Sequence, residues 1–162
     1  MKNLVVYYTR TGNTETVAQQ ISKMVSGELK KIELTKDIGF GWAAFTALLG
    51  LNGKIKPVDI NVKDYDNIFI GCQVWAGKSS TPMNTFLQNT DFTNKNVFVF
   101  ITLGDSKEPT VAIESINKRI KEKGGKAIDT IYIQTDMKNP ITEEQARNAV
   151  EKWINKNKLA TS

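Results

Sequence analysis

Six consecutive residues near the N-terminus combine hydroxyl, amide and glycine groups in a pattern suited to binding an anion. The segment Thr9-Arg10-Thr11-Gly12-Asn13-Thr14 follows a short apolar run and precedes a stretch with helical periodicity. A helix that begins here presents free backbone N–H groups and the positive end of its dipole to a ligand. Threonine hydroxyls can donate to several phosphate oxygens at once. Because the segment contains neither G-x-x-x-x-G-K-[ST] nor G-x-G-x-x-G, we expect neutral donors to hold a terminal phosphate. The alternative is a polar turn in which a threonine only caps the helix.

A second segment, residues 73–80, places a tryptophan after another apolar run. In a loop at the ligand edge of a sheet, Trp75 would offer its ring as a stacking surface for a flat ligand. Alternatively, Trp75 anchors the loop in the core. Gly77 allows a positive φ at little cost, so the Ala76–Gly77 peptide is expected to be able to rotate.

A third segment, residues 102–109, also follows an apolar run. It contains the pair Gly104-Asp105. It contains no aromatic residue between Thr102 and Pro109, so any ring bound here has no stacking partner from this loop.

The elements that must position these segments are short apolar runs that alternate with helical patterns along the chain. Nearly continuous apolar runs predict central strands of a parallel sheet, whereas alternating runs predict strands nearer an edge. Capping and breaking residues such as Thr142 with Gln145, and Gly124-Gly125, mark helix ends. Central strands are predicted at 67–72 and 96–102, a first strand at 4–8, edge strands at 29–34 and 128–133, and helices at 14–25, 81–87, 109–123 and 142–154.

Strict alternation of strands and helices predicts a doubly wound α/β fold, with residues 1–162 forming one domain and one five-stranded parallel sheet. In such a sheet, ligands bind beyond the carboxyl ends of the strands at the topological switch point. We therefore expect the three segments to meet there. The segment 38–57 is the least regular, and its apolar centre is predicted to be either a core helix or a flap over the ligand.

Composition excludes several classes of protein. The 162 residues include no histidine and one cysteine, Cys72, which excludes a histidine-based triad, a histidine metal site and an internal disulfide. No apolar run reaches the roughly 20 residues that a membrane span needs, and no leader is evident, so we expect a cytoplasmic protein. The net charge is +5, but without aromatic–basic interleaving no nucleic-acid partner is expected.

The T-x-T-G-x-T pattern at 9–14 resembles the phosphate loop of the flavodoxin family, and the two later segments follow in the family's order. The resemblance covers about residues 4–154 in the short-chain form. It implies the strand order 2-1-3-4-5 and FMN as a non-covalent cofactor. It also implies cofactor-binding residues in three groups: Thr9, Arg10 through its main chain, Thr11, Gly12, Asn13 and Thr14; Val74, Trp75, Ala76 and Gly77; and Thr102, Leu103, Gly104 and Asp105.

The resemblance implies an electron-transfer protein that passes single electrons between redox partner proteins, with no catalytic residues or metal of its own. The alternative is a two-electron FMN-dependent NAD(P)H or quinone oxidoreductase acting on a small redox substrate. A flavodoxin-like binding module without redox activity would need the phosphate loop to be vestigial.

The chain departs from the family's pattern in two respects. The third segment lacks the usual aromatic, which leaves Phe40, Trp42, a substrate or a partner to cover one ring face. The positive net charge contrasts with the acidic flavodoxins and predicts a less negative potential for the second electron. Oligomeric state is not predicted.

Overall fold

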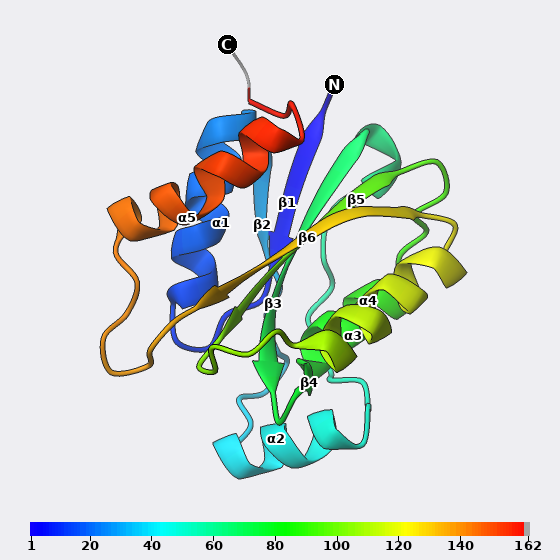
Figure 1. Ribbon diagram of the computed structural model, residues 1–162. Helices are drawn as coiled ribbons and strands as arrows, with labels where there is room; N and C mark the ends of the chain where they lie inside the picture. Colours follow the sequence, from blue (N-terminus) through cyan, green and yellow to red (C-terminus); the bar gives the residue numbers. More distant parts are fainter. Residues whose placement is uncertain (161–162) are drawn as a thin grey trace.

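A parallel sheet with helices on both faces forms the centre of the protein (Figure 1). The computed structural model describes residues 1–160, except for the side chain of Phe40. The strands of the sheet are β1 (Asn3–Tyr7), β2 (Glu28–Lys31), β3 (Asn67–Trp75), β5 (Asn96–Leu103) and β6 (Lys126–Gln134), and a short β4 (Lys78–Ser79) pairs antiparallel with the end of β3. The helices are α1 (Asn13–Val25), α2 (Phe40–Leu48), α3 (Thr81–Asn89), α4 (Thr110–Glu122) and α5 (Glu143–Lys156), with a 3-10 turn at Val62–Asp64.

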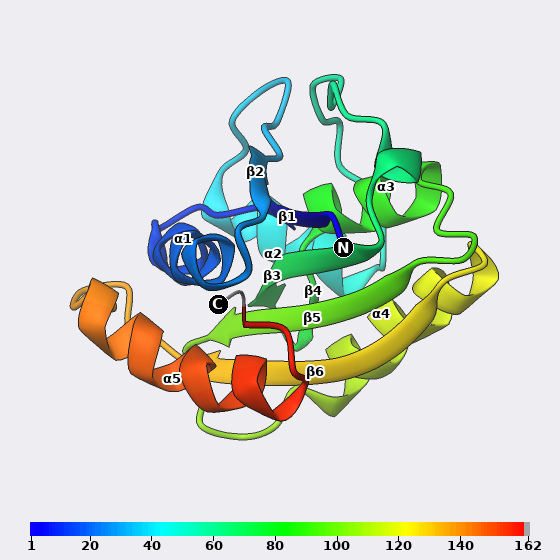
Figure 2. The ribbon, with the colours of Figure 1, turned by 90° about the horizontal axis from the view of Figure 1, so that it is seen from above.

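The sheet has the order β2-β1-β3-β5-β6, which confirms the predicted order 2-1-3-4-5 once the short β4 is set aside. Figure 2 shows β1, β3, β5 and β6 running side by side. The continuously apolar β3 and β5 lie in the middle, buried on both faces, and the alternating β2 and β6 lie at the edges. Edge and centre were therefore predicted correctly from hydrophobic patterning.

Each face of the sheet is covered by a separate apolar cluster. On the face covered by α1 and α5, the Phe69 and Phe98 rings stack 5.1 Å apart, and Trp153 meets both edge-on. On the other face, α3 and α4 contribute Met83 and Ile116, both fully buried. Close packing in these two layers fixes the positions of the strand ends and therefore of the loops that follow them.

The segment after the third strand differs from its prediction. It was expected to be a loop over 73–80, but β3 continues to Trp75 and turns into β4, with Val74 opposite Ser79 and Trp75 opposite Lys78. The connection is only Ala76-Gly77, with φ of 48° and 76°. Two consecutive positive φ angles are what a two-residue type I′ hairpin turn requires. The prediction failed because Ala-Gly is not one of the dipeptides that usually mark such a turn.

The apolar segment 38–57 contains α2, which lies beyond the end of β3 and beside β4 (Figure 1). Its small residues Ala43 and Ala47 are buried, whereas Trp42, Phe45 and Leu48 are 50–61% exposed. The predicted helix is therefore present, and it buries its small side chains while these three large ones stay exposed. No helix within residues 1–160 has the length and apolar character to cross a membrane.

Candidate functional site

The predicted site residues gather at the carboxyl ends of β1, β3 and β5. There a cavity of about 940 Å³ opens between the loops, and a second hollow of about 530 Å³ adjoins it. Val74, Leu103 and Gly104 line both, which makes them the shared wall. Of the other predicted residues, Arg10, Thr11, Asn13, Trp75 and Thr102 line the larger cavity, and Ala76, Gly77 and Asp105 line the smaller hollow.

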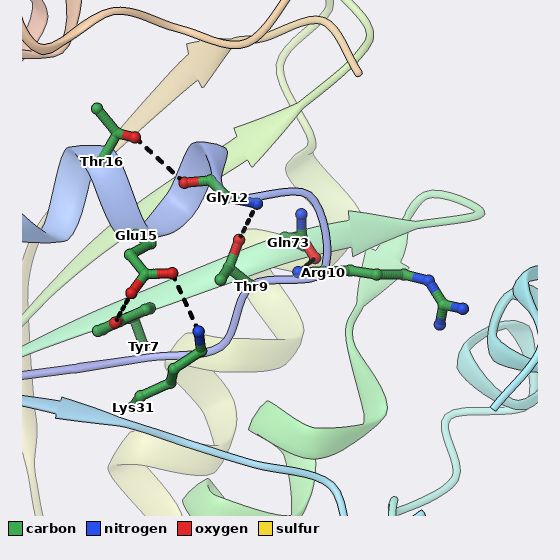
Figure 3. Close-up of polar contacts among 8 residues, drawn as sticks. All are labelled: Tyr7, Thr9, Arg10, Gly12, Glu15, Thr16, Lys31 and Gln73. Carbon is green, nitrogen blue, oxygen red and sulfur yellow. Dashed lines mark hydrogen bonds and ion pairs between the residues drawn. The ribbon is translucent and has the colours of Figure 1, made fainter. Parts of the chain in front are cut away.

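Three predicted residues, Thr9, Gly12 and Thr14, do not line these hollows but shape the loop from behind. The Gly12 N–H donates to Thr9 Oγ1 at 2.9 Å, as Figure 3 shows. Gly12 has a φ of 90°, which favours glycine, and it forms the N-terminal cap of α1 without any side-chain hydrogen bond to the helix end. Because Thr9 Oγ1 acts as an acceptor, its own hydroxyl proton is available for an anion.

Gln73, which sequence analysis did not select, holds the first loop against β3. The Arg10 N–H donates to Gln73 Oε1 at 2.9 Å, and Gln73 Nε2 donates to Thr11 Oγ1 at 3.2 Å (Figure 3 shows the first contact). Thr11 therefore accepts with its oxygen and keeps its proton for a ligand. The signal available in the sequence was a polar side chain directly after the apolar run 67–72. In the structure this side chain is buried, and its hydrogen bonds satisfy it.

A fourth segment, between β6 and α5, also lines the cavity and was missed. Asn13 attaches it to the first loop, because Asn13 Nδ2 donates to the Asp136 carbonyl at 2.9 Å and Asn13 Oδ1 accepts from the Ile141 N–H at 2.9 Å. The Asn13 amide therefore contacts protein. Its position could have identified it from the sequence, because it follows the carboxyl end of a predicted parallel strand, where ligands bind. Its cavity-lining members are Gln134, Thr135, Asp136, Met137, Lys138, Asn139 and Ile141.

Thr14 and Thr102, predicted in separate loops, contact each other directly. Their hydroxyls lie 2.8 Å apart, and both side chains are buried. One hydroxyl donates to the other, which joins the first turn of α1 to the end of β5. This buried contact fixes the first and third loops relative to each other.

The Arg10 side chain extends away from the loop (Figure 3). Its Nη2 donates to the Ile38 carbonyl at 2.6 Å and lies 3.7 Å from the Asp37 carboxylate. The guanidinium therefore connects the first loop to the chain that leads into α2. The resemblance implied that the main-chain N–H of Arg10 binds the phosphate, but in this structure that N–H donates to Gln73 Oε1.

A charged cluster beneath the loop braces the first turn of α1. The Tyr7 hydroxyl donates to Glu15 at 2.8 Å, and Lys31 Nζ donates to the same carboxylate at 3.0 Å (Figure 3). Partial burial raises the pKa of Glu15, but the hydrogen bonds from Lys31 and Tyr7 outweigh it and hold the pKa below its usual value. Burial, reinforced by Glu15, raises the pKa of Tyr7. The ionised carboxylate near the helix N-terminus is thus neutralised by Lys31.

Trp75 lies at the end of a strand and is only 7% exposed. It packs edge-on against Tyr8, with ring centroids 5.6 Å apart, while still lining the larger cavity. Trp75 therefore combines the two expected roles, as a core anchor and as part of the cavity wall. Trp42 lines neither hollow, and the side chain of Phe40 lies outside the described residues.

Cys72 lies at full burial just before this wall. Burial raises the pKa of its thiol to about 11. A thiol with that pKa is protonated near neutral pH and is a poor nucleophile. Cys72 is thus a small core residue, as predicted.

The donors and walls of the larger cavity fit an elongated cofactor with a phosphate at one end and a flat ring at the other. The uncapped N-terminus of α1, with the hydroxyl proton of the cavity-lining Thr11, suits the phosphate, and Thr9 holds the loop through the Gly12 N–H. Val74, Trp75 and Leu103 supply apolar surface for the ring. The volume of about 940 Å³ lies in the range of roughly 300–1,000 Å³ typical of cofactor sites.

Comparison with known proteins gives the family. Residues 4–160 match the family model described as Flavodoxin domain. The curated flavodoxin of Maridesulfovibrio salexigens is 27% identical over 148 residues, which cover 83% of this chain and 87% of that protein.

Solved structures agree with the observed topology. A flavoprotein from Lactobacillus acidophilus, solved in complex with FMN, has a TM-score of 0.70 and 25% identity, with 81% of this chain and 92% of that chain covered. Oxidised Flavodoxin 2 from Bacillus cereus has a TM-score of 0.60 and 23% identity, with 96% and 99% covered, and supports the fold.

Proposed function

Because this chain belongs to the flavodoxin family, we propose that it binds FMN at the carboxyl edge of its sheet and carries single electrons between redox partners. Family membership and the FMN complex of the Lactobacillus acidophilus flavoprotein support FMN as the cofactor. When bound, FMN supplies the redox chemistry. The observation that carries the proposal is one cavity that joins the uncapped N-terminus of α1 to the wall formed by β3 and β5.

Polar donors and apolar side chains would bind different parts of the cofactor. Thr9, Thr11 and the first N–H groups of α1 would hold the phosphate without a full positive charge. The shared wall of Val74 and Leu103, which separates the two hollows, would lie against the ring. The N–H groups of Gly104 and Asp105 would donate to the polar edge of the ring.

The Ala76–Gly77 turn supports transfer of one electron at a time. It lines the smaller hollow, and both of its φ angles are positive. Rotation of the central peptide of such a turn exchanges the carbonyl for the N–H on the side facing the hollow. Rotation changes the φ of Gly77, and because glycine adopts either sign of φ at little cost, the two orientations are expected to lie close in free energy. With the carbonyl facing the hollow, its oxygen would accept a hydrogen bond from an N–H group of the bound ring, and this would favour the ring when it carries one added electron and a proton.

A specific observation also favours the two-electron alternative. The third loop carries no aromatic residue, and its hollow of about 530 Å³ extends to Pro109 and the half-exposed Val111. That space would admit a small redox substrate against the ring.

A visible spectrum recorded during stepwise anaerobic reduction distinguishes these functions. The protein is purified, loaded with FMN and titrated with a chemical reductant. We expect the spectrum to pass through a distinct one-electron stage. Direct two-electron bleaching, together with rapid bleaching by NADPH alone, would establish the oxidoreductase instead. Failure of added FMN to bind would contradict both.

A further inference from the structure

An exposed apolar surface covers the outer side of α2 and the turn after it. This surface, the α2 patch, consists of Trp42, Phe45, Leu48, Leu49 and Leu51, each 47–61% exposed. The Trp42 and Phe45 rings pack against each other with centroids 5.7 Å apart. A surface helix normally turns its large apolar side chains inward, but α2 turns Ala43 and Ala47 inward instead. A contiguous patch of this kind marks an interaction site.

The charges around the α2 patch are unbalanced in favour of cations. No charged residue occurs from 38 to 53. The two acidic residues that precede α2 are already paired, Glu33 with Lys56 and Asp37 with Arg10. Within residues 1–160, no ion pair involves the flanking Lys36 and Lys54 or Lys78 of the adjacent β4. An apolar centre with unpaired lysines around it is complementary to an apolar surface that carries negative charge.

The position of the α2 patch favours its insertion into another surface over the binding of a partner in a groove. Helix α2 lies at one end of the molecule, beyond the end of β3 (Figure 1), and none of its described side chains, those of residues 41–48, lines the two hollows at the cofactor edge. A second copy of this chain would bring each lysine-flanked patch against its own equivalent, because two-fold interfaces pair the same surface with itself. That arrangement opposes like charges.

We propose that the α2 patch docks this protein on an anionic membrane surface. Trp42 and Phe45 would enter the boundary between headgroups and acyl chains, as aromatic side chains of interfacial helices do. Lys36, Lys54 and Lys78 would contact the anionic headgroups. With nine residues, α2 lies on the membrane and does not cross it.

Docking in this orientation would bring the carboxyl edge of the sheet to the membrane. Helix α2 packs beside the β3–β4 hairpin, and the Arg10 contact with Ile38 joins the first loop to the chain before α2. A redox partner that is membrane-bound or lipid-soluble would then meet the protein at its cofactor site. The proposal concerns the surface alone and does not require the proposed function to hold.

Vesicle flotation tests the proposal directly. Full-length protein is mixed at low salt with vesicles of phosphatidylcholine alone or of phosphatidylcholine with phosphatidylglycerol. We expect flotation only with the anionic vesicles. The double variant Trp42→Ser/Phe45→Ser should weaken binding at least about tenfold, and Lys54→Gln should weaken it about fivefold. The matched control is Ile128→Ser/Tyr132→Ser, which removes side chains that are 47% and 41% exposed on β6 and line neither hollow, and it should bind like the wild type.

Three results would overturn the proposal. The first is no flotation of the wild type with either vesicle. The second is equal flotation of the α2-patch variant and the control. The third is a concentration-dependent dimer that Trp42→Ser/Phe45→Ser makes monomeric, without vesicle binding. Circular dichroism and FMN content, recorded for each variant, separate loss of docking from loss of fold or of the cofactor.

Discussion

Replacing Asn13 with alanine tests whether the connection between β6 and α5 is attached to the first loop as the structure indicates. The Asn13 side chain is 2% exposed and makes two hydrogen bonds of 2.9 Å, to the Asp136 carbonyl and from the Ile141 N–H. Alanine removes both. A typical hydrogen bond contributes about 1 kcal/mol net, and water can reach Asp136, so we expect a loss of about 2 kcal/mol. For a chain of this size that lowers Tm by about 4–8 °C.

Urea denaturation of the protein without FMN gives the free energy of unfolding, so the result does not depend on cofactor binding. Asn139→Ala is the matched control, because this exposed amide in the same segment makes only a 3.4 Å contact with Asp136. We expect the control to change stability by less than about 0.5 kcal/mol. If the free energies of unfolding of Asn13→Ala and of the control differ by less than about 0.5 kcal/mol, the two long-range hydrogen bonds do not hold the segment, and the reasoning fails.

Three further predictions concern the site and its surroundings. Gly77→Ala should lower the free energy of unfolding and Ala76→Gly should raise it, each by roughly 0.5–1 kcal/mol, because alanine is strained at positive φ. Urea denaturation measures both changes. Changes of the same sign would contradict the turn geometry. Burial raises the pKa of the Cys72 thiol from 9.0 to about 11. The unfolded chain therefore loses this proton first, so the free energy of unfolding should be constant below pH 9 and fall by about 2–3 kcal/mol as the pH rises to 11. Cys72→Ala should flatten that part of the pH profile, and an unchanged slope would refute the assignment of the pH dependence to Cys72. Thr11 lines the cavity and keeps its hydroxyl proton for a ligand, so Thr11→Val should weaken FMN binding about tenfold in titration calorimetry but leave riboflavin, which lacks the phosphate, unaffected. An equal loss of riboflavin binding would show that Thr11 does not contact the phosphate.

Local interactions made much of this fold predictable. Thr142 and Gln145 form the expected capping box at the start of α5, and α4 ends just before Gly124, which has a φ of 79°. Both features depend on groups a few residues apart, which a sequence displays directly. The continuity of apolar residues in β3 and β5 likewise revealed which strands are buried on both faces.

The sequence alone determined the α/β class, which strands are central and which segments follow their carboxyl ends, whereas the order of the strands came from the family resemblance. Only the tertiary structure decided which side chains meet there. The Gln73 contact with Arg10 spans 63 residues of sequence, and the Asn13 contact with Ile141 spans 128. The tertiary structure also decided the outward orientation of Trp42 and Phe45, since the sequence left their segment as either a core helix or a flap. Periodicity and caps arise from neighbours along the chain, whereas these contacts exist only because two packed layers bring distant strand ends together.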